Sequence, residues 1–82
     1  MTQDVSGLVL YVRDGCHLCD QFLLELTVDL GVDVDQMRVL DVDHDCDLAS
    51  RFGLRVPVLE AHGVVLCEGV YDGARVRQAL RV

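Results

Sequence analysis

The stretch "DGCHLCDQ", residues 14–21, places two cysteines, Cys16 and Cys19, three positions apart. The run before it, "LVLYVR" (Leu8–Arg13), is short, nearly continuous in apolar residues and rich in Val, Leu and Tyr. Such a run, ending at an Asp-Gly turn pair, predicts a buried strand. The cysteine pair is therefore expected in the turn that follows a central strand of a sheet.

A helix is predicted after the first cysteine, because the apolar residues now recur every four positions. Phe22, Leu26 and Leu30 follow this period, and Gly31 is a residue type that commonly ends a helix. The run "MRVLDV" (Met37–Val42) then predicts a second strand. A strand, a helical crossover and a strand of these lengths form a unit in which the two strands are parallel.

The second half of the chain predicts a short helix, a hairpin and a last helix. Residues 43–53 begin with an Asp that suits a helix cap and end with Gly. The run "VPVLEAHGVVLCEG" (residues 56–69) predicts a hairpin with a tight turn at His62-Gly63, and residues 71–82 predict a helix. The order β-α-β-α-β-β-α predicts an α/β fold, a four-stranded mixed sheet flanked by helices, in a single domain over residues 1–82.

The length, charge and composition of the chain limit the classes of function that it can have. The 82 residues suffice for one small domain, and a net charge of −7 disfavours nucleic acid and anionic membrane surfaces as partners. No apolar run is long enough to span a membrane, and residues 1–7 lack the pattern of a secretory signal. We therefore expect the protein in the cytoplasm, where thiols are kept reduced, and we also expect a monomer. There the four cysteines indicate a catalytic pair, a metal site or core packing rather than a disulfide framework.

The predicted position of Cys16 favours a reactive thiolate. The first turn of a helix carries unpaired backbone N–H groups and the positive end of the helix dipole, and both stabilise a thiolate. His17 would add positive charge nearby, whereas Asp14 and Asp20 would work against the thiolate. Cys19 lies one helical turn further along, within reach of a disulfide, and would resolve a mixed disulfide formed by Cys16.

The single proline of the chain, Pro57, opens the predicted third strand in "LRVPVL" (residues 54–59). A proline is tolerated at the start of a strand because its missing N–H costs nothing there. In the cis form it would turn the preceding backbone towards the thiols, so that Val56 would hydrogen-bond a peptide-like substrate. Arg55 is a candidate for binding a substrate carboxylate.

Two segments, "LYVRDGCHLC" (residues 10–19) and "DVDHDCDLASRFGLRVPVL" (residues 41–59), carry a resemblance to a known family. The chain resembles the glutaredoxin-like branch of the thioredoxin superfamily, in particular a group of small bacterial glutaredoxin-like proteins. The resemblance implies a thioredoxin-like fold and thiol–disulfide exchange, with Cys16 as nucleophile, Cys19 as resolving thiol and a cis peptide bond at Val56–Pro57. It implies a protein or a small molecule with a disulfide as substrate, and glutathione or a reductase as electron source.

Several positions depart from the glutaredoxin pattern. Glutaredoxins usually carry aromatic and proline residues between the cysteines, where this chain has His17 and Leu18. Many place a glutathione-binding Lys before the first cysteine, where this chain has Arg13 and Asp14, and they commonly have Thr at the position of Arg55. These differences disfavour glutathione binding, and no tightly bound cofactor is expected.

Two other functions stay open at this point. Cys16, Cys19, His44 and Cys46 include the ligand types of a zinc site, although the spacing of the last two is poor for one. By analogy with the family, an iron–sulfur cluster shared across a dimer through Cys16 is a weaker form of this metal alternative. The other alternative is a thioredoxin-fold binding module with weak or no redox activity, which recognises a partner through the groove between Cys16 and Pro57.

Overall fold

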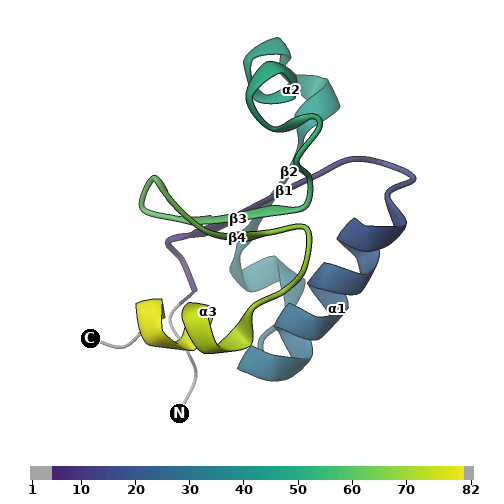
Figure 1. Cartoon of the computed structure of the whole chain (residues 1–82). Coiled ribbons are helices and arrows are strands. Elements are labelled where there is room, and N and C mark those ends of the chain that lie inside the picture. The colour runs from purple at the N-terminus through teal and green to yellow at the C-terminus, as the bar shows by residue number, and fades with distance from the viewer. Residues whose placement is uncertain (1–4, 81–82) are drawn as a thin grey trace.

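The computed structural model describes residues 5–80, which form a mixed sheet and flanking helices (Figure 1). The strands are β1 (Leu8–Val12), β2 (Arg38–Asp41), β3 (Val58–Ala61) and β4 (Val64–Glu68). The helices are α1 (His17–Leu30), α2 (Cys46–Phe52) and α3 (Gly73–Leu80), with short 3₁₀ turns η1 (Val34–Gln36) and η2 (Val42–His44). The strand order is β2-β1-β3-β4, with β1 and β2 parallel and the other neighbours antiparallel. The predicted fold class is confirmed.

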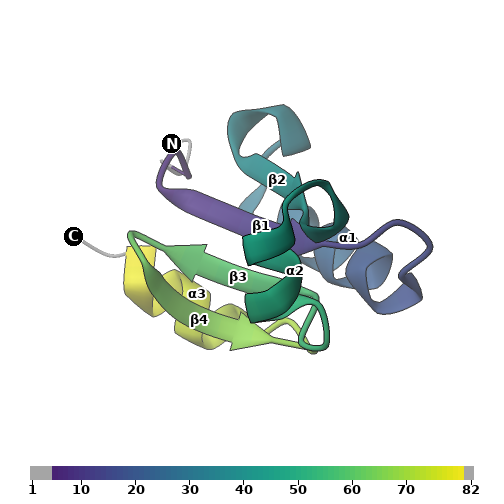
Figure 2. The same ribbon diagram turned by 90° about the horizontal axis from the view of Figure 1, so that it is seen from above.

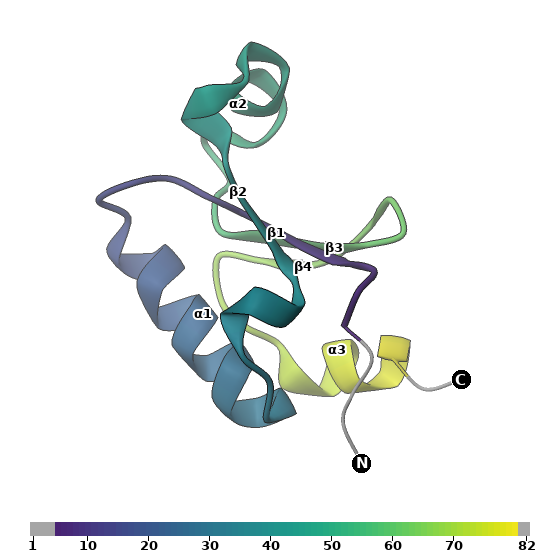
Figure 3. The same ribbon diagram turned by 180° about the vertical axis from the view of Figure 1, so that it is seen from behind.

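The helices cover the two faces of the sheet unequally. Helices α1 and α3 lie on one face, and α2 lies on the other (Figures 1 and 2). The view from behind shows α1 and α3 side by side on the same face (Figure 3). The larger core lies on the α1–α3 face, and its buried side chains are Val5, Leu8, Leu10, Phe22, Leu26, Leu30, Val32, Met37, Leu59, Leu66 and Val76. A smaller core lies on the α2 face and comprises Tyr11, Val42, Phe52 and Val58.

The ends of α1 follow the sequence signals. Cys16 is its N-terminal cap, and Gly31 ends it in the left-handed conformation, with φ of 64°. Such a φ favours glycine because a Cβ atom would crowd the following carbonyl group. The cysteine pair therefore lies where the sequence predicted it, between β1 and α1.

The helix predicted over residues 43–53 is interrupted. The chain forms η2 first and then α2, because two aspartates act as separate caps. The Asp41 side chain accepts the backbone N–H of Asp43, and the Asp45 side chain accepts the N–H groups of Asp47 and Leu48. Aspartates that bond nearby backbone groups compete with a continuous helix, so a 3₁₀ turn and a short α-helix replace one longer helix.

Helices α1 and α3 are joined by a polar cluster at their exposed edge. The Tyr71 hydroxyl donates to Asp29 at 2.7 Å, and Nη1 of Arg77 donates to both carboxylate oxygens of Asp29 at 2.7 and 2.6 Å. The hydrogen bond from Tyr71, with the neighbouring Arg77 charge, holds the pKa of Asp29 below its usual value. Folding therefore favours the ionised form of the Asp29 carboxylate.

Among residues 5–80, none of the helices is long and apolar enough to cross a membrane.

Replacing Asp29 by asparagine is expected to lower the free energy of unfolding at pH 7. The difference in the free energy of unfolding between the variant and the unmodified chain should become smaller below about pH 4. The ordinary pKa of 3.8 is lowered in the fold. The ionised form therefore stabilises the protein above that pH, and its contribution is lost as the pH falls through the folded-state pKa. Urea denaturation at pH 7 and pH 3 measures both differences.

The matched control is Asp35→Asn, which removes an exposed carboxylate that has no ion pair among the described residues. It should change the free energy of unfolding little at either pH. An Asp29→Asn difference that stays equal at pH 7 and pH 3 would contradict the assigned role of the carboxylate.

Candidate functional site

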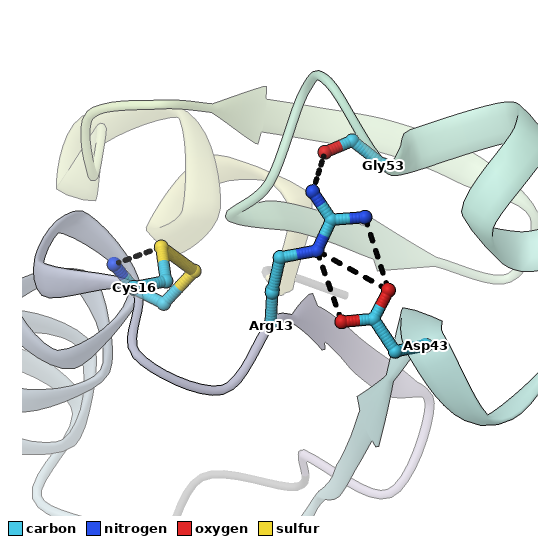
Figure 4. Close-up of a disulfide and its surroundings, with 5 residues drawn as sticks. Arg13, Cys16, Asp43 and Gly53 are labelled. Carbon is cyan, nitrogen blue, oxygen red and sulfur yellow. Dashed lines mark hydrogen bonds and ion pairs between the residues drawn. A yellow bond between two sulfur atoms is a disulfide. The ribbon is translucent and has the colours of Figure 1, made fainter.

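Cys16 and Cys19 form a disulfide at the start of α1, with their Cα atoms 5.2 Å apart (Figure 4). Cys16 is partly exposed at the cap position, whereas Cys19 is 2% exposed inside the first turn. The two sulfurs therefore differ in access. The outer one can meet a substrate, and the inner one is shielded from all but its partner.

The backbone around Cys16 suits a negative charge on its sulfur. The Cys16 Sγ atom accepts the backbone N–H of Cys19 at 3.1 Å. This N–H is one of the donors that a helix leaves unpaired at its N-terminus, where the helix dipole is positive. In the reduced protein the same donor and dipole would favour the thiolate, which is the nucleophilic form of cysteine.

The Val56–Pro57 segment lies beside the connection between β4 and α3. Its peptide bond is cis, and the Pro57 side chain is fully buried. The Pro57 carbonyl accepts the backbone N–H of Gly69 at 2.8 Å. Gly69 in turn lines a small hollow together with Leu18 from the first turn of α1. The proline segment, the β4–α3 connection and the start of α1 are therefore neighbours.

Val56 has one of its two backbone groups already engaged. Its N–H donates to the Phe52 carbonyl at 3.0 Å. A peptide that approaches Val56 would therefore find the carbonyl as the remaining acceptor. The prediction that Val56 binds substrate did not include this contact with Phe52.

Arg13 holds the loop before the cysteines, a role that the sequence analysis missed. Its Nε and Nη2 donate to the Asp43 carboxylate at 3.1 to 3.3 Å, and its Nη1 donates to the Gly53 carbonyl at 2.9 Å (Figure 4). One side chain thus joins the end of β1 to η2 and to the end of α2. Its position directly before the turn was the only available signal, because both partners lie at least 30 residues away.

Replacing Arg13 by alanine should lower the free energy of unfolding by about 1 kcal/mol, because it leaves the Asp43 carboxylate and the Gly53 carbonyl without this donor. Chemical denaturation of the reduced protein measures the change. Arg38→Ala removes an exposed arginine from β2 that has no ion pair among the described residues. Equal losses in the two variants would show that Arg13 acts only as a surface charge.

Arg55 and His17, the other predicted substrate-binding residues, differ in their surroundings. Arg55 is paired with Glu68 through contacts of 2.8 and 3.1 Å, and its guanidinium lies 5.3 Å from the Phe52 ring centre. The hydrogen bond from Arg55 lowers the pKa of Glu68, so the pair is ionised and its charges balance. The His17 side chain is exposed and has no partner among residues 5–80.

The remaining cysteines lie apart from the pair. Cys46 is exposed at the start of α2, and Cys67 is half-buried in β4, where burial raises the pKa of its thiol. Within residues 5–80, no three His, Cys, Asp or Glu side chains come together in a way that could hold a metal ion. The zinc set of Cys16, Cys19, His44 and Cys46 is therefore not assembled.

Comparison with known proteins adds three similar structures and one family. The model of the glutaredoxin-like domain (DUF836) matches residues 7–81. Protein Ne2328 from Nitrosomonas europaea is 30% identical over 99% of this chain and 100% of its own, with a TM-score of 0.77. Protein XcR50 from X. campestris is 36% identical over 89% of this chain and 93% of its own, with a TM-score of 0.69.

A more distant likeness shows the fold alone. The holo form of glutaredoxin C1 from Populus tremula x tremuloides is 16% identical, with a TM-score of 0.50 over 89% of this chain and 72% of its own. No curated protein sequence matches the chain.

Proposed function

The chain belongs to the glutaredoxin-like domain (DUF836) family, and on this premise we propose that it is a thiol–disulfide oxidoreductase that reduces disulfides of proteins or small molecules. One observation carries the proposal, namely the disulfide between a partly exposed cysteine at a helix N-terminus and a buried cysteine one turn away. The exposed sulfur suits attack on a substrate, and the buried sulfur suits the internal step that follows.

The proposed reaction has two exchange steps. The Cys16 thiolate attacks one sulfur of the substrate disulfide, forms a mixed disulfide, and releases the other substrate sulfur as a thiolate that takes a proton from solvent. Cys19 then loses its proton to solvent and attacks the Cys16 sulfur, which closes the Cys16–Cys19 disulfide and releases the second substrate thiolate, which takes a proton from solvent. The substrate gains two electrons and two protons, and the protein dithiol is oxidised.

Val56 and Pro57 would orient the substrate in this proposal. The Val56 carbonyl is the group best suited to accept a backbone N–H of a peptide, since the Val56 N–H is bonded to Phe52. The buried Pro57 ring would form the floor beneath the reacting sulfurs. His17 would contribute only charge near the thiolate, because its side chain is exposed beside Cys16.

The electron source that we propose is a reductase rather than glutathione. Glutathione carries two carboxylates and would need free cationic groups near the dithiol. Arg13 is bound to Asp43, and Arg55 is bound to Glu68, so neither charge is free. The reductive direction also needs a reducing compartment, and we propose the cytoplasm.

A redox titration with counting of free thiols tests the proposed function. The protein is equilibrated in defined thiol–disulfide buffers, its free thiols are alkylated, and the products are counted by mass spectrometry. We expect one reversible Cys16–Cys19 disulfide with a midpoint between roughly −160 and −300 mV. Cys46 and Cys67 should stay reduced and should therefore be alkylated at every potential. A pair that never oxidises in this range would overturn the proposal and favour a binding module without redox activity.

A further inference from the structure

A groove runs along the line between α1 and α3 and begins at Leu18, which lies between the two cysteines in the sequence. Its first part, beside the start of α1, is a hollow of about 90 Å³ whose lining includes Leu18 and Val70. Its second part is a hollow of about 490 Å³ whose lining includes Leu24, Val28 and Ala74. Glu25 and Tyr71 line both parts, so the two hollows lie next to each other. We call the whole feature the α1–α3 groove.

Apolar side chains are concentrated in this groove. The described residues contain seven large apolar side chains that are exposed, and four of them line it. These are Leu18, Leu24, Val28 and Val70, which are 54%, 64%, 72% and 75% exposed. Exposed apolar side chains that gather along one groove commonly mark a binding surface.

The charge in the middle of the groove is negative and unpaired. Glu25 is exposed, and its carboxylate has no partner among residues 5–80. The other charges that line the second hollow, Asp29 and Arg77, neutralise each other in the polar cluster with Tyr71. The groove therefore offers apolar contacts around one uncompensated anion, which a cationic side chain would complement.

The dimensions of the groove match a short extended peptide. Leu18 and Val28 are ten positions apart on α1, which is about 15 Å along the helix axis. An extended chain advances about 3.3 Å per residue, so about five residues would fill this length. Glu25 lies nine positions beyond Cys16, which corresponds to about four residues of extended peptide measured from the reacting sulfur.

We infer that the α1–α3 groove binds the substrate segment next to the reacting disulfide, and that this segment is an extended protein chain with apolar side chains and a basic residue about four positions from its cysteine. The inference rests on the proposed function, because the groove begins at Leu18, between the two cysteines in the sequence. It assigns a protein rather than a small anion as substrate. Glu25 is the specificity-determining residue, and Leu24 and Val28 supply apolar contact.

Single-turnover kinetics with defined peptides test the inference. The protein is reduced, freed of reductant, and mixed with peptides that each contain one intramolecular disulfide. The peptides carry apolar residues next to the cystine and either Lys or Glu four positions away, on the N-terminal or the C-terminal side. Oxidised glutathione and bis(2-hydroxyethyl) disulfide serve as small substrates. Quenching with an alkylating reagent followed by mass spectrometry gives each rate constant for oxidation of the dithiol.

The expected result is a preference that follows the charge of residue 25. The unmodified protein should react about tenfold faster with a Lys peptide than with the matching Glu peptide, and Glu25→Arg should reverse the order. Asp35→Arg makes the same change in net charge on η1, outside the groove, and should keep the preference for Lys. A preference that Glu25→Arg leaves intact, or that Asp35→Arg also reverses, would overturn the inference.

The apolar contacts have their own readout, which is the ratio of the peptide rate to the rate with bis(2-hydroxyethyl) disulfide. The double variant Leu24→Ser/Val28→Ser should lower this ratio about tenfold. Val64→Ser, at the hairpin end of β4, should leave the ratio as it is in the unmodified protein. Because both rates are measured on the same sample, a misfolded variant lowers both and is recognised.

The remaining outcomes separate this inference from the proposed function. If the reduced protein reacts with none of the disulfides, the proposed function fails and the inference fails with it. If it reacts with the small disulfide but shows neither charge nor apolar preference, only the inference fails. Analytical ultracentrifugation tests whether a second copy of the chain occupies the groove instead. If the protein is a dimer that Leu24→Ser/Val28→Ser dissociates, and the peptide ratio does not change, the inference is overturned.

Discussion

Replacing Cys16 by serine lowers the rate of disulfide reduction at least about 10³-fold without unfolding the protein. A serine hydroxyl is not ionised near neutral pH, so the nucleophile at the helix N-terminus is lost. Serine is a preferred helix cap, and its oxygen can accept the N–H of Cys19 as the sulfur does. The variant should therefore lose its activity and keep its stability. Single-turnover reduction of bis(2-hydroxyethyl) disulfide measures the first, and urea denaturation under reducing conditions measures the second.

The two other cysteine variants define what the loss means. Cys19→Ser keeps the nucleophile but removes the resolving thiol, so one equivalent of mixed disulfide on Cys16 should accumulate and be visible by mass. Cys46→Ser removes an exposed thiol outside the pair and should keep the rate of the unmodified protein. Activity that survives in Cys16→Ser, or that disappears in Cys46→Ser, would assign the chemistry to another sulfur.

The parts of the fold that the sequence predicted correctly are those set by local pattern. The change from a continuous apolar run to a four-residue period located the turn that carries Cys16, and Gly31 located the end of α1. His62-Gly63 predicted the hairpin turn, where both residues have positive φ. Each of these signals depends on neighbours within a few positions, so one sequence suffices to detect them.

Contacts between segments that are far apart in the sequence could not be predicted from such local signals. Arg13 is bound to Asp43 and Gly53 across 30 and 40 positions, and no local pattern indicates either partner. The pairing of Arg55 with Glu68 depends on where the segment before β3 meets the end of β4, which no local period specifies. The α1–α3 groove likewise exists only because the sheet brings both helices to one face.

The core beneath the dithiol gives the second large effect, through Phe22 on α1. Its side chain is 1% exposed, packs in the larger core, and meets the Tyr71 ring edge-on with ring centres 5.4 Å apart. Phe22→Ala should lower the free energy of unfolding by about 3–5 kcal/mol, since it removes buried apolar surface and leaves a cavity. A domain of this size is expected to be stable by only about 4–12 kcal/mol. The melting temperature should therefore fall by roughly 12 °C or more.

Leu24→Ala is the matched control because it shortens a large side chain on the same helix at an exposed position. It should change the free energy of unfolding by about 0.5 kcal/mol or less. Both variants are measured by urea denaturation with the dithiol reduced, so that the disulfide adds nothing to either value. Phe22 holds α1 against the sheet, and α1 holds Cys19 out of solvent, so Phe22→Ala should also speed alkylation of Cys19 at urea concentrations below the transition. If Phe22→Ala were as stable as Leu24→Ala, this prediction would be wrong. α1 would then be held chiefly by its polar edge, through Asp29, and its buried face would contribute little to shielding the Cys19 thiol.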